Sequence, residues 1–119
     1  GGPAPLPPGR EMSQTLDLPP GTWSISLRYS SWVPLSLRAG SLHVRLPAIT
    51  EPPLQFRLAG AVHSPGGPVR VSVRAEHGGW GLIARDAEVD AVAATPAPWP
   101  VRTQSLSRAC GAYVDWFAR

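Results

Sequence analysis

The sequence has no lysine and no asparagine, only one cysteine, few charged residues and no long apolar run. Because Cys110 stands alone, no disulfide can form within the chain, and we expect a buried thiol or a bond to a cysteine outside this segment. No stretch reaches the roughly 18 to 20 apolar residues of a spanning helix, so the fragment itself is not expected to cross a membrane. Lysine and asparagine codons are rich in adenine, and a GC-rich genome explains both absences.

Charged residues make up 16% of the chain, which is low against the roughly 25% that is typical of soluble domains. Proline (15 residues) and glycine (12 residues) take their place. Because each internal proline costs a helix about 3 kcal/mol, this composition argues against a helical bundle and favours short strands joined by tight turns. A length of 119 residues suits one domain.

Residues 15–46 alternate between apolar and polar side chains and are interrupted by Pro-Gly, Ser-Ser and Ala-Gly turns. A period of two is the pattern of a half-buried antiparallel sheet. The clearest strand covers residues 22–29, where every second side chain faces the core. The expected inward set of this run is Trp23, Ile25, Leu27, Tyr29, Leu35, Leu37, Leu42, Val44 and Leu46.

The same alternation returns in the second half of the chain. Strands are expected over residues 54–58, 69–74, 82–94 (one long strand or two short ones) and 101–106, and the last 13 residues fit either a strand or an amphipathic turn. In the third of these, Ala87, Val89, Ala91 and Ala93 are expected on one side. About eight such strands predict an all-β fold, an antiparallel two-sheet β-sandwich with jelly-roll topology.

The first twelve residues contain four prolines and lack the apolar core of a signal peptide. We therefore expect residues 1–12 to form a Pro/Gly-rich linker or extended arm. Residues 13–119 then form the β-sandwich domain. The Gly-Gly start suggests a domain excised from a longer protein.

Local signatures of catalysis are missing from the sequence. His43, His63 and His77 do not have zinc-ligand spacing, no serine occurs in G-x-S-x-G, and no glycine-rich phosphate loop follows a strand. No local signature surrounds Cys110 either. We expect no enzyme activity and no cofactor.

Three carboxylates alternate at Asp86, Glu88 and Asp90. On an extended strand they share one face, about 7 Å apart, and calcium would need further oxygens from loops. The alternative is a solvated acidic face that pairs with Arg70 or Arg74 of a neighbouring strand. The second interpretation is favoured, and no metal site is expected.

A net charge of +3 and a sequence pI near 10.0 are compatible with an anionic partner. The arginines, however, are scattered over many strands, and no nucleic-acid-binding motif accompanies them. We expect no nucleic-acid partner.

Tryptophans in expected loops carry most of the functional information. A sugar ring packs its C–H groups on an exposed aromatic face while polar side chains bind its hydroxyls. Trp80 lies in the glycine-rich run EHGGWG, Trp32 at a turn and Trp99 between two prolines. Each could instead fold back over the core. The candidate ligand-binding set is Trp80, Trp32 and Trp99 for stacking, with His77, Arg74 and Glu76 as hydroxyl partners.

The phrase LDLPPGTWSISLRYSS (residues 16–31) resembles the opening strand of β-sandwich carbohydrate-binding modules and other galactose-binding-like jelly rolls. Together with VPLSLRAG (33–40) and RACGAYVDWF (108–117), it is similar to the exoplasmic β-sandwich of actinobacterial multi-pass envelope membrane proteins. The resemblance implies a domain at the extracellular face of the cell envelope, tethered through a larger membrane protein. It also implies association with envelope polysaccharide synthesis or export, and it supplies no catalytic residues.

Two functions follow as hypotheses. The first is a non-catalytic carbohydrate-binding-like accessory domain of a cell-envelope protein, whose partner is envelope polysaccharide. The second is a structural or protein-interaction domain that packs against the remainder of a membrane protein and buries the same tryptophans.

Overall fold

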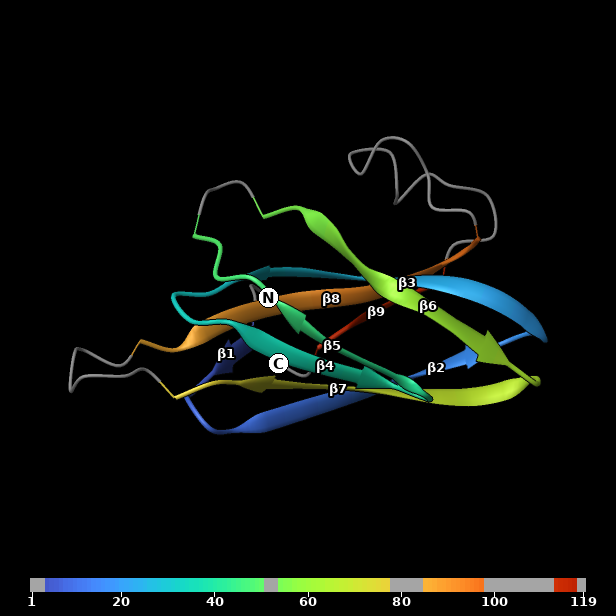
Figure 1. Cartoon of the computed structure of the whole chain (residues 1–119), viewed down its shortest axis with the longest axis horizontal. Coiled ribbons are helices and arrows are strands. Elements are labelled where there is room, and N and C mark those ends of the chain that lie inside the picture. Colours follow the sequence, from blue (N-terminus) through green and yellow to red (C-terminus); the bar gives the residue numbers. More distant parts are fainter. Residues whose placement is uncertain (1–3, 51–53, 78–84, 98–112, 118–119) are drawn as a thin grey trace.

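The computed structural model describes residues 4–50, 54–77, 85–97 and 113–117, which form nine β-strands (Figure 1). These ranges contain no helix, and so none that could cross a membrane. The strands are β1 (Ala4–Leu6), β2 (Glu11–Leu18), β3 (Gly21–Ser30), β4 (Leu35–Ala39), β5 (Leu42–Leu46), β6 (Phe56–Ser64), β7 (Gly67–Ala75), β8 (Ala87–Pro96) and β9 (Tyr113–Trp116).

The strands form two antiparallel sheets that lie one over the other (Figure 1). The first sheet has the order β1-β8-β3-β6, with β9 also paired to β8, and the second has the order β2-β7-β4-β5. Consecutive strands thus cross repeatedly from one sheet to the other, which is the winding of a jelly roll. The expected all-β, two-sheet sandwich is confirmed.

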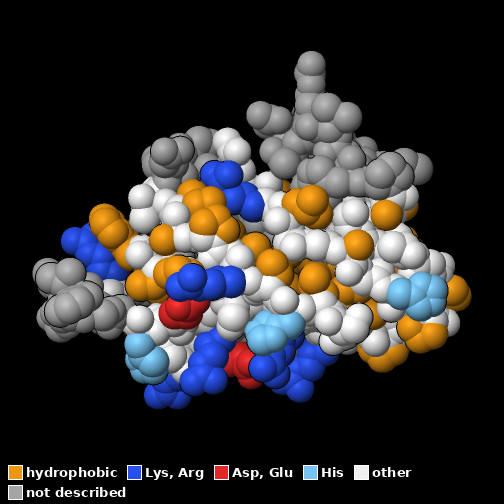
Figure 2. Space-filling view, viewed as in Figure 1, with side chains coloured by type: hydrophobic (Ala, Val, Ile, Leu, Met, Phe, Trp, Pro, Cys, Tyr) orange, Lys and Arg blue, Asp and Glu red, His pale blue; other side chains and the backbone are white. Residues whose placement is uncertain are grey.

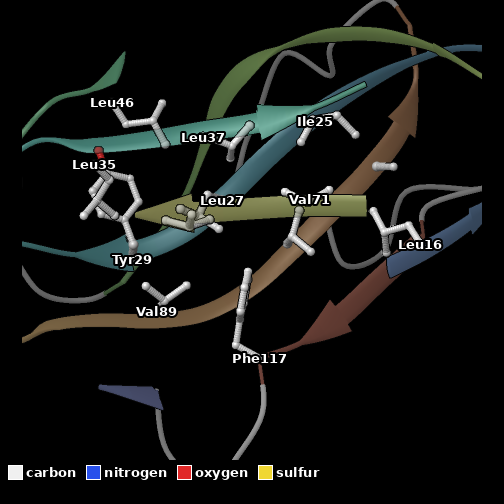
Figure 3. Packing of buried hydrophobic residues seen from close by; sticks show 14 of the residues in the cluster. Leu16, Ile25, Leu27, Tyr29, Leu35, Leu37, Leu46, Val71, Val89 and Phe117 are labelled. Atoms are coloured by element: carbon white, nitrogen blue, oxygen red, sulfur yellow. The ribbon is translucent and has the colours of Figure 1, made fainter. Parts of the chain in front are cut away.

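The core fills the space between the sheets. Ile25 and Leu27 of β3 meet Leu35 and Leu37 of β4 there, and all four side chains are fully buried (Figure 3). These residues were assigned inward by the alternation alone. At 7% exposure Trp23 also belongs to the core, and its Nε1 donates a hydrogen bond to Pro19 O (3.0 Å).

The edge strand β5 is the partial exception. Leu46 is buried, but Leu42 and Val44 only pack against the rim of the core and stay partly accessible. An edge strand has one neighbour instead of two, so its inward side chains are less covered. The alternation predicts direction correctly here and overestimates burial.

A β-bulge corrects the expected inward face of β8. Arg28 of β3 is opposite Ala91 and Tyr29 is opposite Val89, so Asp90 is an extra residue in the ladder. A bulge of this kind shifts the alternation by one position. The residues of β8 that pack in the main core are therefore Ala87, Val89, Val92 and Ala94, whereas Ala91 and Ala93 pack with Phe56 in a separate cluster on the other side.

Part of the expected linker is a strand of the sandwich. Ala4 and Leu6 are buried in the core, and β1 pairs with residues 87–89 of β8. The boundary expected at residue 12 falls inside β2. Prolines at alternate positions suggested a linker, but β1 is a short edge strand, where a missing N–H is tolerated.

Within the last 13 residues, which fit either a strand or an amphipathic turn, residues 113–116 form β9, which pairs with residues 91–94 of β8. The Tyr113 ring meets Trp23 edge-on at 5.2 Å, and the buried Phe117 completes the core below β8 (Figure 3). The strand expected over residues 101–106 and the environment of Cys110 lie outside the described residues.

Candidate functional site

Trp32 lies at one end of the sandwich, in the connection between β3 and β4. The preceding Ser31 is buried, its hydroxyl contacts both the N and O atoms of Val33, and its backbone forms a bridge with Ile49. This local turn directs the next side chain outward, and Trp32 is 59% exposed, the most exposed of the large hydrophobic residues described. The guanidinium of Arg85 lies 4.8 Å from its ring centroid, within the range of a cation–π contact.

Glu76 is held close to the same loop. Its backbone N donates to Pro34 O (3.1 Å), two residues after Trp32. Its carboxylate accepts two hydrogen bonds from Arg45, at 2.6 Å from Nε and 3.0 Å from Nη2. Pro34 and Arg45 also line an open hollow of about 230 Å³ together with Leu46 and Pro47.

The Arg45–Glu76 pair determines the charge state of this corner. The bidentate guanidinium holds the pKa of Glu76 below its ordinary value, mainly through the side-chain hydrogen bonds. The carboxylate in turn raises the pKa of Arg45. Glu76 is therefore a fixed anion and hydrogen-bond acceptor at neutral pH and is poorly suited to donate a proton.

His77 lies over the turn between β1 and β2. Gly9 adopts φ +76°, and a Cβ atom there would lie 2.5 Å from the His77 ring. The Gly9 N donates to Ala75 O (2.8 Å), which ties this turn to the end of β7. The exposed imidazole thus lies against this turn.

The buried Tyr29 side chain holds the connection between β5 and β6 in place. The Tyr29 hydroxyl donates to Pro47 O (2.6 Å), and the residue is 1% exposed. Burial raises the pKa of Tyr29 to about 12, against a smaller lowering by the charge of Arg57. The hydroxyl is therefore a permanent donor that holds one wall of the hollow.

Arg74 lies on the outer face of the second sheet. It projects outward from β7, directly opposite Glu11 of β2 and Ser36 of β4. Ser36 is in turn opposite Arg45, so Arg74 shares a row of the sheet with the Arg45–Glu76 pair. It borders the loop cluster and does not reach Trp32 through any contact in the described residues.

The three alternating carboxylates do not converge. Asp86 precedes β8, Glu88 is exposed, and Asp90 is the buried bulge residue, whose Oδ2 lies 3.3 Å from Arg28 Nε. No group of three metal-ligating side chains occurs in the part of the chain that the structure describes. The partner proposed from sequence was wrong, because Arg70 and Arg74 belong to the opposite sheet.

The structure thus brings Trp32, Glu76 and His77 to one end of the sandwich, while Trp80 and Trp99 lie outside the described residues. Sequence reasoning missed Arg85, which stacks on Trp32, and Arg45, which orders Glu76. The outward position of Arg45 in its strand was a usable signal. Its pairing with Glu76, 31 residues away, depends on the strand order and could not be deduced locally.

Comparison of the chain with protein-family models, with curated proteins and with solved structures finds no match.

Proposed function

We propose that the chain is a non-catalytic carbohydrate-binding accessory domain, located at the extracellular face of a cell envelope and tethered through a larger membrane protein. The observation that carries the proposal is Trp32, a loop tryptophan that is 59% exposed and has an arginine stacked on its ring. An exposed aromatic face is the surface on which the C–H groups of a sugar pack.

The neighbourhood supplies the polar half of such a site. Arg85, which lies over one face of the Trp32 ring, brings up to five N–H donors beside the aromatic platform. Glu76 and Arg45 offer a fixed acceptor and donor beside the hollow at Pro34. Donors and acceptors flanking an apolar platform are what the alternating C–H and hydroxyl groups of a saccharide require.

Binding fits this corner better than hydrolysis. Glycoside hydrolysis normally needs a pair of carboxyl groups, one with a raised pKa that acts as a general acid. Glu76 has a lowered pKa and both of its oxygens accept from Arg45. The ligand in this proposal is envelope polysaccharide, and Trp80 and Trp99 stay predicted contributors.

A protein-interaction domain is the second candidate, and the outer face of the first sheet favours it. Leu58 of β6 is 46% exposed and Val114 of β9 is 36% exposed. The two stand at the ends of a single row across the four strands β6, β3, β8 and β9, whose middle residues, Ser26 and Ala93, are fully buried. Exposed apolar side chains at the two ends of this row suit contact with the rest of a membrane protein.

The two candidates are separated by titrating the domain with soluble glucan, mannan and arabinogalactan while following tryptophan fluorescence. Carbohydrate binding gives a saturable change with at least one of them, and Trp32→Ala removes that change without lowering Tm, because the side chain is exposed. Leu58→Ala is the matched control, because Leu58 is an exposed apolar residue of β6 and not of the loop that carries Trp32, and it is expected to leave the titration unchanged. No saturable change in the unmodified protein, or loss in Leu58→Ala but not in Trp32→Ala, would overturn the proposal.

A further inference from the structure

The outer face of the second sheet is almost entirely polar and rich in arginine. Figure 2 shows Arg and His side chains gathered over the lower part of the molecule, where β4, β5 and β7 lie. Pro68 is the only apolar side chain that the alternation places on this face of the four strands. The other outward residues are Glu11, Ser13, Thr15 and Asp17 of β2, Arg70, Ser72 and Arg74 of β7, Ser36 and Arg38 of β4, and His43 and Arg45 of β5.

Arg38 is the centre of this arrangement. It lies directly opposite Ser72 on one side and His43 on the other. Its diagonal neighbours are therefore Arg70 and Arg74 on β7 and Arg45 on β5, each roughly 7–8 Å away. We call Arg38 with these three neighbours the arginine face. Long guanidinium side chains at this spacing can converge on one ligand.

Most of this positive charge is not neutralised. Among the described residues the Arg45 side chain is paired with Glu76, whereas the side chains of Arg38, Arg70 and Arg74 form no ion pair and no hydrogen bond. Glu11 is opposite Arg74 in the ladder, but the two side chains are not within ion-pair distance. No two of the four arginines lie directly opposite each other in the ladder, so their mutual repulsion is moderate. Among the described residues, no side-chain contact of Arg38, Arg70 or Arg74 gives this gathering of charge a role in folding.

The shape and chemistry of the face indicate the class of partner. Small hydroxyl side chains lie between the arginines, so the face is flat and open and offers groups that hydrogen-bond to sugar hydroxyls. No exposed aromatic residue lies on it, and single-stranded nucleic acid depends on such residues for base stacking. Guanidinium groups bind carboxylates by paired, charge-assisted hydrogen bonds.

We propose that the arginine face binds an acidic polysaccharide, with Arg38 and its neighbours on β7 contacting carboxylate groups of successive sugars. This inference rests on the proposed function, which supplies the class of ligand, a carbohydrate. It adds that the carbohydrate is acidic. The row from Arg74 through Ser36 to Arg45 leads to Glu76, whose backbone N is bonded to Pro34 O. One extended chain can therefore run from the arginine face to the loop that carries Trp32.

The test uses polygalacturonate and its methyl-esterified, uncharged form as probes in calorimetric titrations. The charged polymer binds and the ester binds much more weakly, and added salt weakens only the former. Arg38→Gln weakens polygalacturonate binding about tenfold or more, the usual effect of losing a charged hydrogen-bonding partner. Ser72→Glu, which places a carboxylate opposite Arg38, weakens it at least as much.

Thr22→Glu is the matched control, because it changes the net charge as Ser72→Glu does but lies at an exposed position of β3 on the other sheet. It is expected to alter binding less than about twofold, since solvent screens distant charges. Equal loss in Thr22→Glu and Ser72→Glu would overturn the proposal. Tighter binding to a single-stranded DNA oligonucleotide, or to phosphatidylglycerol-containing vesicles, would overturn it as well.

The two proposals fail differently. If neutral glycans bind through Trp32 but Arg38→Gln and methyl esterification have no effect, the arginine face is refuted and the proposed function stands. If neither neutral glycans nor polygalacturonate bind the unmodified domain, both are refuted. A thermal melt of each variant verifies folding, and because Arg38 is exposed and surrounded by like charge, Arg38→Gln is expected to keep or raise Tm.

Discussion

Removing the hydroxyl of Tyr29 tests both a buried hydrogen bond and its pH dependence. In Tyr29→Phe the donor to Pro47 O is lost from a residue that is 1% exposed, while the ring and its packing stay. A hydrogen bond of this kind contributes about 1 kcal/mol to the free energy of unfolding. At neutral pH we therefore expect the unmodified protein to be more stable than the variant by about that amount.

In alkaline solution we expect Tyr29→Phe to become more stable than the unmodified protein. The pKa of Tyr29 is raised in the folded state from 10.0 to about 12. The stability that the Tyr29 hydroxyl contributes is fully present below the pKa of the unfolded state. It is lost as the pH rises through the pKa of the folded state, because the unfolded chain gives up the proton first. At ~1.4 kcal/mol per pKa unit, the loss between about pH 10 and pH 12 is close to 3 kcal/mol, which exceeds the hydrogen bond.

The two stability curves are thus expected to cross between about pH 10 and pH 11, with Tyr29→Phe the more stable protein above the crossing. Urea unfolding followed by far-UV circular dichroism at several pH values measures both curves. The two proteins differ only in the Tyr29 hydroxyl, so the comparison isolates that group. Parallel curves without a crossing, or a more stable variant at neutral pH, would refute the reasoning.

Three further substitutions probe the frame that holds the site. Leu37→Ala leaves a cavity at a fully buried position and should lower the free energy of unfolding by about 2–5 kcal/mol in urea titrations; a loss under about 1 kcal/mol would mean that the two sheets pack loosely there. Gly9→Ala places a Cβ at φ +76° against the His77 ring and should lower Tm measurably in thermal melts, and an unchanged Tm would contradict this turn geometry. Ser64→Ala leaves the Gly66 N without its buried acceptor (3.1 Å) and should cost about 1–2 kcal/mol, with faster hydrogen exchange at that amide; unchanged exchange would exclude the bond.

The alternation of apolar and polar residues was sufficient to predict those strands in which the same alternation holds from the first residue to the last. The strand carrying Ile25 and Leu27 is the clearest case, and both side chains are fully buried as expected. The strand containing Asp90 was predicted with the wrong face over its second half, because a bulge leaves no mark in the pattern of residue types. The first strand was missed because its prolines are equally typical of an extended linker.

The candidate site was predictable only in part. The turn position of Trp32 was visible in the sequence, but the sequence does not decide whether its ring folds back over the core or faces solvent, and the structure shows it exposed. The alternation also indicates that Arg70 and Arg74 face outward together. That Arg38 lies between them depends on β4 pairing with β7, a contact between strands far apart in the chain, and no local pattern specifies such pairing.

The pairing of Ala4 with Val89 also has a consequence for the order of folding. Almost the whole sandwich lies between these two residues in sequence, so their contact closes one of the longest loops in the domain. Folds dominated by such distant contacts form slowly, because chain entropy is lost before the contacts are gained. Until the eighth strand is in place the first has no edge to join, so the nascent N-terminal segment has to wait for nearly the full domain to leave the ribosome.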